Sequence, residues 1–508
     1  MPTVTVTSII DPNKSYQYVD KGSPSAAGGM KDIYFSPDKS YVVGFYRAPQ
    51  DFNSIERLKK IVTTYYDRFF NNAAGAYYKE LYSWPTDVIK YNNRIGIIVP
   101  CYNKNFFFKK GYALTDALKG EDKQGKWFAS PLFRVSVSKS KLDSSELGTW
   151  LSYFQIGINI ARGVKRLHAA GLAHSDLSYK NVLIDPVSKT AAIIDIDGLV
   201  VPGLFAPDVI GTPDFIAPEV LATLHLNIKD PNRKLPNIQT DKYALAVLIY
   251  MYLLYRHPLK GGKFFGADIE ADEEVKLSMG TKAVFIEHPT DKSNQNLKRE
   301  YGDNLQKFKP WTDLAKTPYT ILGPYLKELF DLAFIKGLHN PNERPPASMW
   351  EQALIKTMDL KLQCANARCD QKWFIYNDTN NTSCPFCNTR YNTSIPILDL
   401  YFQTAPGKWK PENQRLVVYN GTTLQLWHTN RNVITNENLT PAQKIPVGYF
   451  SFYNNKWLFV NQTLTSLVDK SENKDIKIGE MVELTSGKQL ILSKEDGGRV
   501  AVISIANN

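Results

Sequence analysis

The stretch G-L-A-H-S-D-L-S-Y-K-N-V-L-I-D, residues 171–185, decides the fold of this chain. A histidine precedes Asp176 by two residues, and Asn181 follows Asp176 after five. Upstream, residues 144–168 carry apolar side chains at helical spacing, and downstream two short apolar runs are joined by P-V-S-K-T, as in a hairpin. The pattern therefore predicts a helix, a polar loop and a hairpin whose second strand ends at Asp195.

This order of elements and residues resembles the catalytic core of protein kinases. In that family an Asp accepts or orients the substrate hydroxyl, and an Asn and a second Asp hold the magnesium that bridges the phosphates. The resemblance implies that Asp176 is the catalytic base and that Asn181 and Asp195 are the magnesium ligands. Because D-I-D-G stands where many kinases have D-F-G, Asp197 is the alternative ligand.

Landmarks farther along the chain occur in the order that the resemblance requires. G-T-P-D-F-I-A-P-E (211–219) is similar to the end of a kinase activation segment, and the apolar run after Asp241 is similar to a buried central helix of the C-lobe. H-P-L-K-G (257–261) follows that run, and Arg344 is the expected ion-pair partner of Glu219. These matches disfavour an unrelated α/β fold.

The nucleotide clamp departs from the family pattern. A turn with Gly22, Gly28 and Gly29 lies between two expected strands, and glycines let backbone amides approach the phosphates of ATP. The third strand, Y-V-V-G, has Gly44 where kinases carry lysine. Lys31, on the second strand, stands where the with-no-lysine kinases carry their displaced lysine. We expect Lys31 to bind the phosphates; the alternative is an exposed strand residue.

Two further parts of the nucleotide site follow from the resemblance. The amphipathic run 51–70 is the expected helix of the first lobe, and Glu56 on it is the expected acidic partner of Lys31, with Glu80 as the competing candidate. After the strand R-I-G-I-I-V, the segment from Pro100 to Tyr102 is the expected hinge. Backbone groups there would hydrogen-bond to adenine.

The catalytic loop lacks a common regulatory arginine. Ser175 takes the position from which many kinases pair Arg with a phosphorylated residue, and residues 199–210 contain no Ser, Thr or Tyr. We therefore expect an enzyme that activation-loop phosphorylation does not switch. Ser178 stands where Ser/Thr kinases carry lysine, but Lys180 follows it and can point a compact positive charge toward the transferring phosphoryl group.

Four of the five cysteines lie in one short segment with the spacing C-x4-C-x14-C-x2-C. Two cysteine pairs joined by a short β-like connector suit tetrahedral zinc–thiolate coordination without an open ligand position. The segment 361–395 is therefore interpreted as a zinc ribbon with a structural Zn²⁺, stabilising the fold or docking a protein. The expected ligands are Cys364, Cys369, Cys384 and Cys387.

Residues 397–508 alternate polar and apolar side chains between turn signals, which predicts a small β-sandwich. The pattern resembles forkhead-associated domains, but their Gly-Arg and Ser-x-x-His signatures are absent, and the nearest stretch is W-H-T-N-R-N (427–432). We expect a related sandwich with lost or changed phosphopeptide binding.

The predicted fold class is α+β: a bilobal protein-kinase-like fold, then the zinc ribbon, then the all-β, forkhead-associated-like sandwich. The kinase-like domain is expected at 20–358, with an N-lobe at about 20–102 and a C-lobe at about 103–358, after a polar lead-in.

Composition agrees with a folded chain, since 43% of the 508 residues are hydrophobic and 22% are charged. The longest apolar run, 243–255, is too short to span a bilayer, and the first residues do not read as a secretory signal. We expect a cytoplasmic protein without a membrane partner. The net charge of +11 comes without long basic blocks, so nucleic acid is not an expected partner.

The module order, together with G-G-M-K-D-I-Y-F-S-P-D, Y-S-W-P-T-D-V and D-I-D-G, resembles one bacterial group. That group comprises the kinases of the kinase–phosphatase–von Willebrand A-domain triads associated with tellurite resistance and stress signalling. The resemblance implies an ATP- and Mg²⁺-dependent kinase, expected to be Ser/Thr-specific, with a von Willebrand A-domain protein as substrate and a PP2C-like phosphatase as opponent.

Two alternatives stay open. Gly44, Ser175 and the D-I-D-G turn favour a pseudokinase scaffold. The same turn favours a kinase-fold small-molecule phosphotransferase, against which the intact A-P-E segment and the two appended modules argue.

Overall fold

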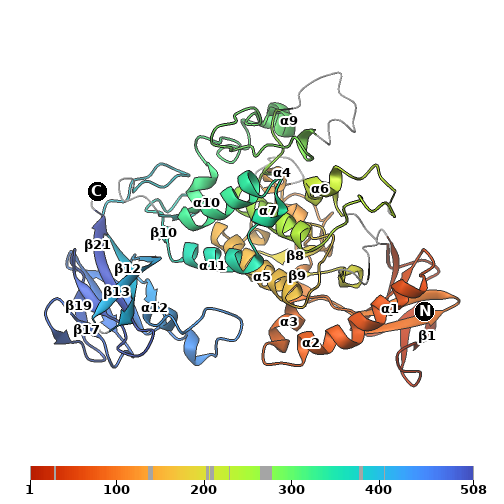
Figure 1. Ribbon diagram of the computed structural model, residues 1–508, viewed down its shortest axis with the longest axis horizontal. Helices are drawn as coiled ribbons and strands as arrows, with labels where there is room; N and C mark the ends of the chain where they lie inside the picture. The colour runs from red at the N-terminus through yellow and green to blue at the C-terminus, as the bar shows by residue number, and fades with distance from the viewer. Residues whose placement is uncertain are drawn as a thin grey trace. The chain divides into compact units, whose positions relative to one another are not determined.

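The computed structural model describes residues 2–27, 30–134, 141–201, 205, 211–227, 229–263, 277–376, 382–405 and 407–506 (Figure 1). The chain divides into two compact units. One comprises Met1–Leu314 and Leu329–Glu351, and the other comprises Ala315–Glu328 and Gln352–Asn508. Among the described residues, no helix has both the length and the apolar character needed to cross a membrane. Gly28 and Gly29 lie outside the described residues.

The first unit opens with a seven-stranded antiparallel sheet in the order β2-β1-β6-β7-β5-β4-β3. The expected polar lead-in is part of this sheet, because Val4 and Val6 alternate with threonines and Val6 is buried against β5 and β6. The strands are β1 Thr3–Ser8, β2 Ser15–Val19, β3 Ala26–Ala27, β4 Lys31–Phe35, β5 Tyr41–Tyr46, β6 Asp87–Tyr91 and β7 Arg94–Pro100.

Three short helices follow β5, and the first of them packs on this sheet. Asp51 caps α1 (Phe52–Lys60) by accepting a hydrogen bond from the Ser54 amide at 2.7 Å. The chain continues through a π turn at 61–65 into α2 (Tyr66–Phe70), and α3 (Gly75–Leu81) follows. Leu58 and the π-turn residue Val62 pack against one sheet face, on a cluster that includes Tyr46, Val88, Ile95 and Ile97.

The helical part of the first unit is organised around α5 (Trp150–Ala169) and α7 (Ile238–Leu254). Asn237 and Thr240 form a capping box at the start of α7, and nearly every later residue of that helix is buried. The expected hairpin is present as β8 (Val182–Asp185) and β9 (Thr190–Ile193). Shorter helices of this unit are α4 Pro131–Arg134, α6 Pro218–Leu221 and α9 Lys298–Tyr301. Helices α10 Pro324–Asp331 and α11 Ala347–Met358 each have residues in both units.

The expected ion pair between Glu219 and Arg344 is confirmed. The guanidinium donates to both carboxylate oxygens of Glu219, at 2.8 and 2.7 Å, and also to three backbone carbonyls. The Arg344 side chain is fully buried, and this bidentate arrangement satisfies a charge that would otherwise be costly to bury.

In the second unit, a two-stranded ribbon, β10 (Lys361–Gln363) with β11 (Trp373–Ile375), precedes two larger sheets. These have the orders β13-β12-β21-β20-β17-β18 and β14-β15-β16-β19. Side chains of both sheets share one apolar core, so the sheets pack face to face as a sandwich. The strands are β12 Ile395–Ala405, β13 Lys408–Val417, β14 Thr423–Leu424, β15 Gly448–Tyr453, β16 Lys456–Asn461, β17 Val468–Asp469, β18 Lys474–Asp475, β19 Met481–Glu483, β20 Gln489–Ile491 and β21 Arg499–Ala506.

The W-H-T-N-R-N stretch of the sandwich includes the helix α12 (Leu426–Thr429). His428 is buried, with its Nε2 3.2 Å from Asp359 Oδ1, and Asn430 donates to the carbonyl of Asp496 at 2.9 Å. His428 thus contacts the residue that follows α11, and Asn430 is bonded to the loop between β20 and β21.

Candidate active site and metal centre

The first turn of α7 holds the predicted catalytic loop through hydrogen bonds to its backbone. The buried carboxylate of Asp241 accepts hydrogen bonds from the backbone amides of His174 (2.7 Å) and Ser175 (3.2 Å). A carboxylate is favourable at this position because the amino end of a helix carries partial positive charge. Ser175 adopts a left-handed conformation, with φ of 68°, immediately before Asp176. Such backbone strain persists where the surrounding structure enforces it.

The structure brings Asp176 and Asn181 into direct contact. The Asn181 amide donates to Asp176 Oδ2 at 2.8 Å and to the Asp176 carbonyl at 2.9 Å, while the Thr212 backbone amide donates to Oδ1 at 2.6 Å. The Asp176 carboxylate is thus oriented but only partly buried. Partial exposure of the carboxylate is a requirement for a group that is to accept a proton from a substrate.

Asp195 follows β9 and is tied to the same loop. The Ile194 amide donates to the Asn181 carbonyl at 3.0 Å, and the ring Nε2 of His174 lies 2.9 Å from the Ile194 carbonyl. Asp195 itself is left-handed, with φ of 64° and ψ of 37°. This conformation places a second strained residue at the predicted metal site.

Lys31 is the first residue of β4 and reaches across to the D-I-D-G turn. Its Nζ lies 2.8 Å from Asp195 Oδ1 and 2.6 Å from Asp197 Oδ2. An ideal Cβ at Gly44 would lie 3.7 Å from Lys31 Cδ and 3.2 Å from the side chain of Ile33. A side chain at position 44 would therefore crowd Ile33, whereas it would meet the Lys31 stem at an ordinary van der Waals distance.

The charge state of this cluster follows from its contacts. Burial by itself would lower the pKa of Lys31, but the carboxylates of Asp197 and Asp195 outweigh it and raise the pKa above its usual range. Burial likewise works against the charged form of Asp197, yet the Lys31 ammonium brings its pKa below the usual range. The lysine is thus a cation and the aspartate an anion at neutral pH.

The expected pairing of Glu56 with Lys31 is absent. Glu56 pairs with Lys59 at 2.8 Å on the flank of α1, because the helix turns Arg57 and Leu58 inward instead. The competing candidate, Glu80, is exposed on α3.

The remaining predicted nucleotide-site residues are placed as follows. Gly22 has a positive φ of 77° but precedes β3, so it does not lie between β3 and β4. Pro100 ends β7, and Tyr102 packs on a cluster of Phe106, Leu183 and Ala192. The Tyr102 hydroxyl donates to Asp122 Oδ2 at 3.1 Å, and burial raises the pKa of the phenol.

The loop between Asp176 and Asn181 leaves Lys180 exposed. Ser178 is fully buried, and its Oγ accepts a hydrogen bond from Thr212 Oγ1 at 3.1 Å. Thr212 is itself buried, so its hydroxyl is not presented to an enzyme that would modify it. Most of the expected phosphorylation-free segment, 202–204 and 206–210, lies outside the described residues.

Sequence reasoning gave Asp197 only as an alternative metal ligand and did not single out Tyr46. The structure places the Tyr46 hydroxyl as a hydrogen-bond donor to Asp197 Oδ2. Tyr46 is the last residue of β5, and a tyrosine at a strand end carries no motif, so no local signal could have found it.

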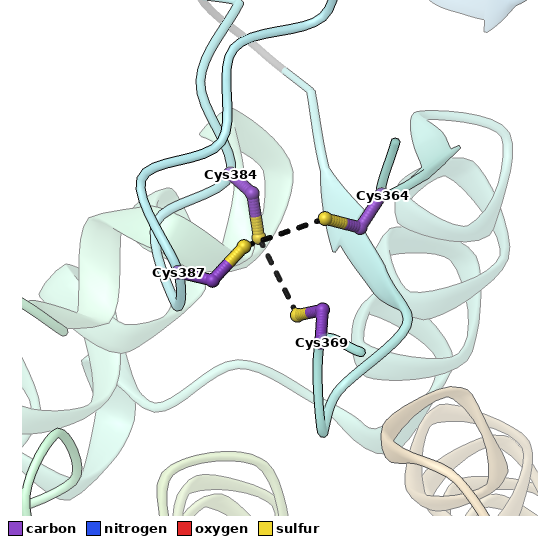
Figure 2. A group of neighbouring side chains, drawn as sticks. All are labelled: Cys364, Cys369, Cys384 and Cys387. Atoms are coloured by element: carbon purple, nitrogen blue, oxygen red, sulfur yellow. Dashed lines mark hydrogen bonds between the residues drawn. The ribbon is translucent and has the colours of Figure 1, made fainter. Parts of the chain in front are cut away.

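The four clustered cysteines converge at one point (Figure 2). Their Sγ atoms all lie within 4.8 Å of one another, with Cys364–Cys387 at 3.5 Å and Cys369–Cys384 at 3.9 Å. Tetrahedral coordination with Zn–S bonds of about 2.3 Å requires sulfur separations of about 3.8 Å. The donor set therefore fits a zinc ion, and the tight turn in which the Asn388 amide donates to the Cys384 carbonyl supports one pair of ligands.

Part of the chain is similar to known proteins. Residues 132–311 match the family model described as Protein kinase domain. The Dual serine/threonine and tyrosine protein kinase of Apis mellifera is 34% identical over 109 residues, which are 22% of this chain and 10% of that protein. The Gallus gallus protein of the same name is 33% identical over 96 residues, 19% of this chain and 9% of that one.

This chain thus matches about a tenth of the length of these curated relatives. A crystal structure of a Toxoplasma gondii specific rhoptry antigen kinase domain aligns with a TM-score of 0.35 and 16% identity, over 55% of this chain and 79% of that one. The chain has a protein-kinase-like fold, with a four-cysteine site and additional sheets.

Proposed function

We propose that the chain is an ATP-dependent protein kinase that transfers the γ-phosphoryl group of ATP to a protein hydroxyl. The observation that carries the proposal is the position of Lys31, whose ammonium lies 2.8 Å from Asp195 although the third strand has no lysine. A chain that had lost nucleotide binding would have no need to supply this cation from a neighbouring strand. Asp176 and Asn181, which are hydrogen-bonded to each other, are the further residues that phosphoryl transfer would require.

The residues present fit ATP and magnesium. Asn181 and Asp195 would hold the metal, which when bound neutralises charge on the phosphates, and Lys31 would bind the phosphates directly. Asp176 would accept or orient the proton of the acceptor hydroxyl, and the exposed Lys180 would add positive charge beside it. The backbone between Pro100 and Tyr102 would bind adenine.

The acceptor is proposed to be a serine or threonine of a protein. The names of the matched relatives include both serine/threonine and tyrosine specificity, so they support a protein acceptor more than one residue type. The motif resemblance to kinases of the bacterial triads supports a von Willebrand A-domain protein as substrate and a PP2C-like phosphatase as opponent, in stress signalling linked to tellurite resistance.

The appended modules are proposed to stabilise and dock rather than to catalyse. A Zn²⁺ ion held by the four cysteines would close the ribbon, which has a small core of its own. The sandwich is proposed to be related to forkhead-associated domains. Because the side chains of His428 and Asn430 make internal bonds, we propose that the sandwich does not bind phosphopeptide through the W-H-T-N-R-N stretch.

A second candidate function is a scaffold that binds nucleotide without transfer. The ion pair between Lys31 and Asp195 favours it, because the lysine occupies one oxygen of a predicted metal ligand. Magnesium would have to displace that contact or share the carboxylate.

Magnesium-dependent ATP turnover by the purified full chain tests the proposal. Asp176→Ala and Lys31→Ala are each expected to reduce kcat/KM for ATP by about 100-fold or more. Lys90→Ala, which removes an exposed lysine on β6 of the same sheet, is the matched control and should turn over like the parent. Nucleotide binding without turnover by the parent chain would favour the scaffold, and full activity of Lys31→Ala would refute the clamp.

A further inference from the structure

We propose that Asp197 and Tyr46 are positioning residues that hold Lys31, in place of an acidic residue on α1, and leave Asp195 for the metal. The inference rests on the proposed function, because it concerns the lysine that would bind the phosphates of ATP. It assigns different roles to the two aspartates of the D-I-D-G turn and gives a role to a tyrosine that no motif marks.

The two aspartates differ in exposure. The Asp197 side chain is 7% exposed and the Lys31 side chain 14%, whereas that of Asp195 is 45% exposed. A buried carboxylate needs a partner within the protein, and Lys31 supplies it at 2.6 Å. Asp195 also contacts Lys31, at 2.8 Å, but it remains open to solvent, so a hydrated magnesium ion can share its carboxylate or displace that contact. Magnesium usually keeps several of its waters, which suits the more exposed carboxylate.

Tyr46 closes the arrangement from β5. It is the register partner of Lys31 across the β4–β5 ladder, so its side chain lies beside the lysine. Its hydroxyl donates to Asp197 Oδ2, the oxygen that Lys31 also contacts, and the ammonium lies 5.4 Å from the centre of the tyrosine ring. The carboxylate thus receives a neutral and a charged donor, and the ring face adds an attraction for the cation.

Helix α1 does not supply the acidic partner. Its inward residue next to Glu56 is Arg57, which is buried. Glu56 is held on the flank of the helix by Lys59. The anion that fixes Lys31 therefore comes from the D-I-D-G turn, and the position of that turn rather than of α1 sets the position of the lysine.

Two quantities separate the roles: the dissociation constant of the full chain for ATP, and the Mg²⁺ concentration that gives half-maximal ATP binding or turnover. Asp197→Asn is expected to weaken ATP binding about tenfold, because a charge-assisted contact to the lysine is lost, while the Mg²⁺ requirement stays within about twofold of the parent. Tyr46→Phe should weaken ATP binding about threefold, in the same direction and again without a change in the Mg²⁺ requirement.

The matched variants are Asp195→Asn and Glu56→Gln. Asp195→Asn should raise the Mg²⁺ requirement about tenfold or more, and Glu56→Gln should behave like the parent in both measurements. A raised Mg²⁺ requirement with unchanged ATP affinity in Asp197→Asn would make Asp197 the metal ligand and overturn the inference. So would a loss of ATP affinity in Glu56→Gln as large as that in Asp197→Asn.

The experiment distinguishes this inference from the proposed function. Should Asp197→Asn fail to fold, Tyr46→Phe compared with Glu56→Gln decides, and unchanged ATP binding in Tyr46→Phe would count against the inference. Binding that follows the expected pattern without phosphoryl transfer would refute the kinase proposal and leave the positioning roles intact. Transfer by the parent with the roles of Glu56 and Asp197 reversed would refute the positioning roles alone.

Discussion

Replacing Lys31 with methionine should destabilise the first unit as well as abolish ATP binding. The ammonium lies 2.6 Å from Asp197, and both side chains are largely buried. At an effective dielectric constant of about 20 the gross attraction is about 6 kcal/mol, but the desolvation of both ions offsets much of it. Removing one partner leaves a buried carboxylate unpaired, so we expect Lys31→Met to lower the free energy of unfolding by about 3–5 kcal/mol.

The double variant Lys31→Met/Asp197→Asn distinguishes this cost from the catalytic loss. It removes both charges, so its free energy of unfolding should return to within about 1–2 kcal/mol of the parent value, while ATP binding stays absent. Urea unfolding of the full chain, followed by tryptophan fluorescence, measures stability, and Lys90→Met is the control for loss of an exposed lysine. Stability of Lys31→Met equal to that of Lys90→Met, or no recovery in the double variant, would refute the buried ion pair.

Three further predictions concern parts of the chain outside the nucleotide site. Cys384→Ser should reduce the bound zinc of the purified chain from about one equivalent to none, measured by elemental analysis, and retention of a full equivalent would contradict the four-cysteine centre. Arg344→Met should lower the free energy of unfolding by about 3–5 kcal/mol, whereas Arg415→Met, which breaks an exposed ion pair with Asp399, should cost about 1 kcal/mol or less; equal costs would contradict the role of the buried pair. Burial lowers the pKa of His257 to about 4, and its Nδ1 accepts the Leu259 amide hydrogen bond, so the folded state keeps the ring neutral. The pKa of His257 is about 6.5 in the unfolded chain and about 4 in the folded chain, so between these pH values the unfolded chain binds more protons. The free energy of unfolding should therefore fall by up to about 3 kcal/mol as the pH drops from about 6.5 to about 4. A His257→Gln variant that shows the same pH dependence would contradict this assignment.

Residues of the catalytic loop could be predicted from the sequence because the fold holds them by local means. Asp176 and Asn181 are five residues apart in one loop, and a single amide–carboxylate hydrogen bond of 2.8 Å joins them. The position of Lys31 on the second of two paired strands also followed from the sequence, since the sequence predicts two strands with a glycine-bearing turn between them, and β3 does pair with β4.

The acidic partner of Lys31 could not be predicted in the same way. It depends on which residues of α1 face inward and on where the D-I-D-G turn places its aspartates. The apolar positions Ile55, Leu58 and Val62 define the inward stripe of α1 and its π-turn continuation, and Glu56 lies off that stripe. That spacing of apolar residues was the sequence signal against Glu56 as an inward-facing partner. No sequence pattern shows that the D-I-D-G turn delivers Asp197 to the ammonium, because the contact joins segments 166 residues apart.

The N-terminal hairpin illustrates a different limit. Polar composition made the first residues a lead-in, although T-V-T-V-T alternates with the period of a half-buried strand. The pairing of β1 with β6 shows that these residues form a strand of the sheet. The sequence alone does not show it, because an edge strand such as β6 can either pair with a further strand or stay unpaired.

The central claim is that phosphate moves from ATP to a protein side chain under the control of Asp176. Mass spectrometry of the full chain and of added protein acceptors, after incubation with ATP and Mg²⁺, tests it most directly. The account predicts phosphorylated serine or threonine with the parent chain and none with Asp176→Ala. ATP consumption that yields no protein phosphate, or equal protein phosphorylation by Asp176→Ala, would contradict it.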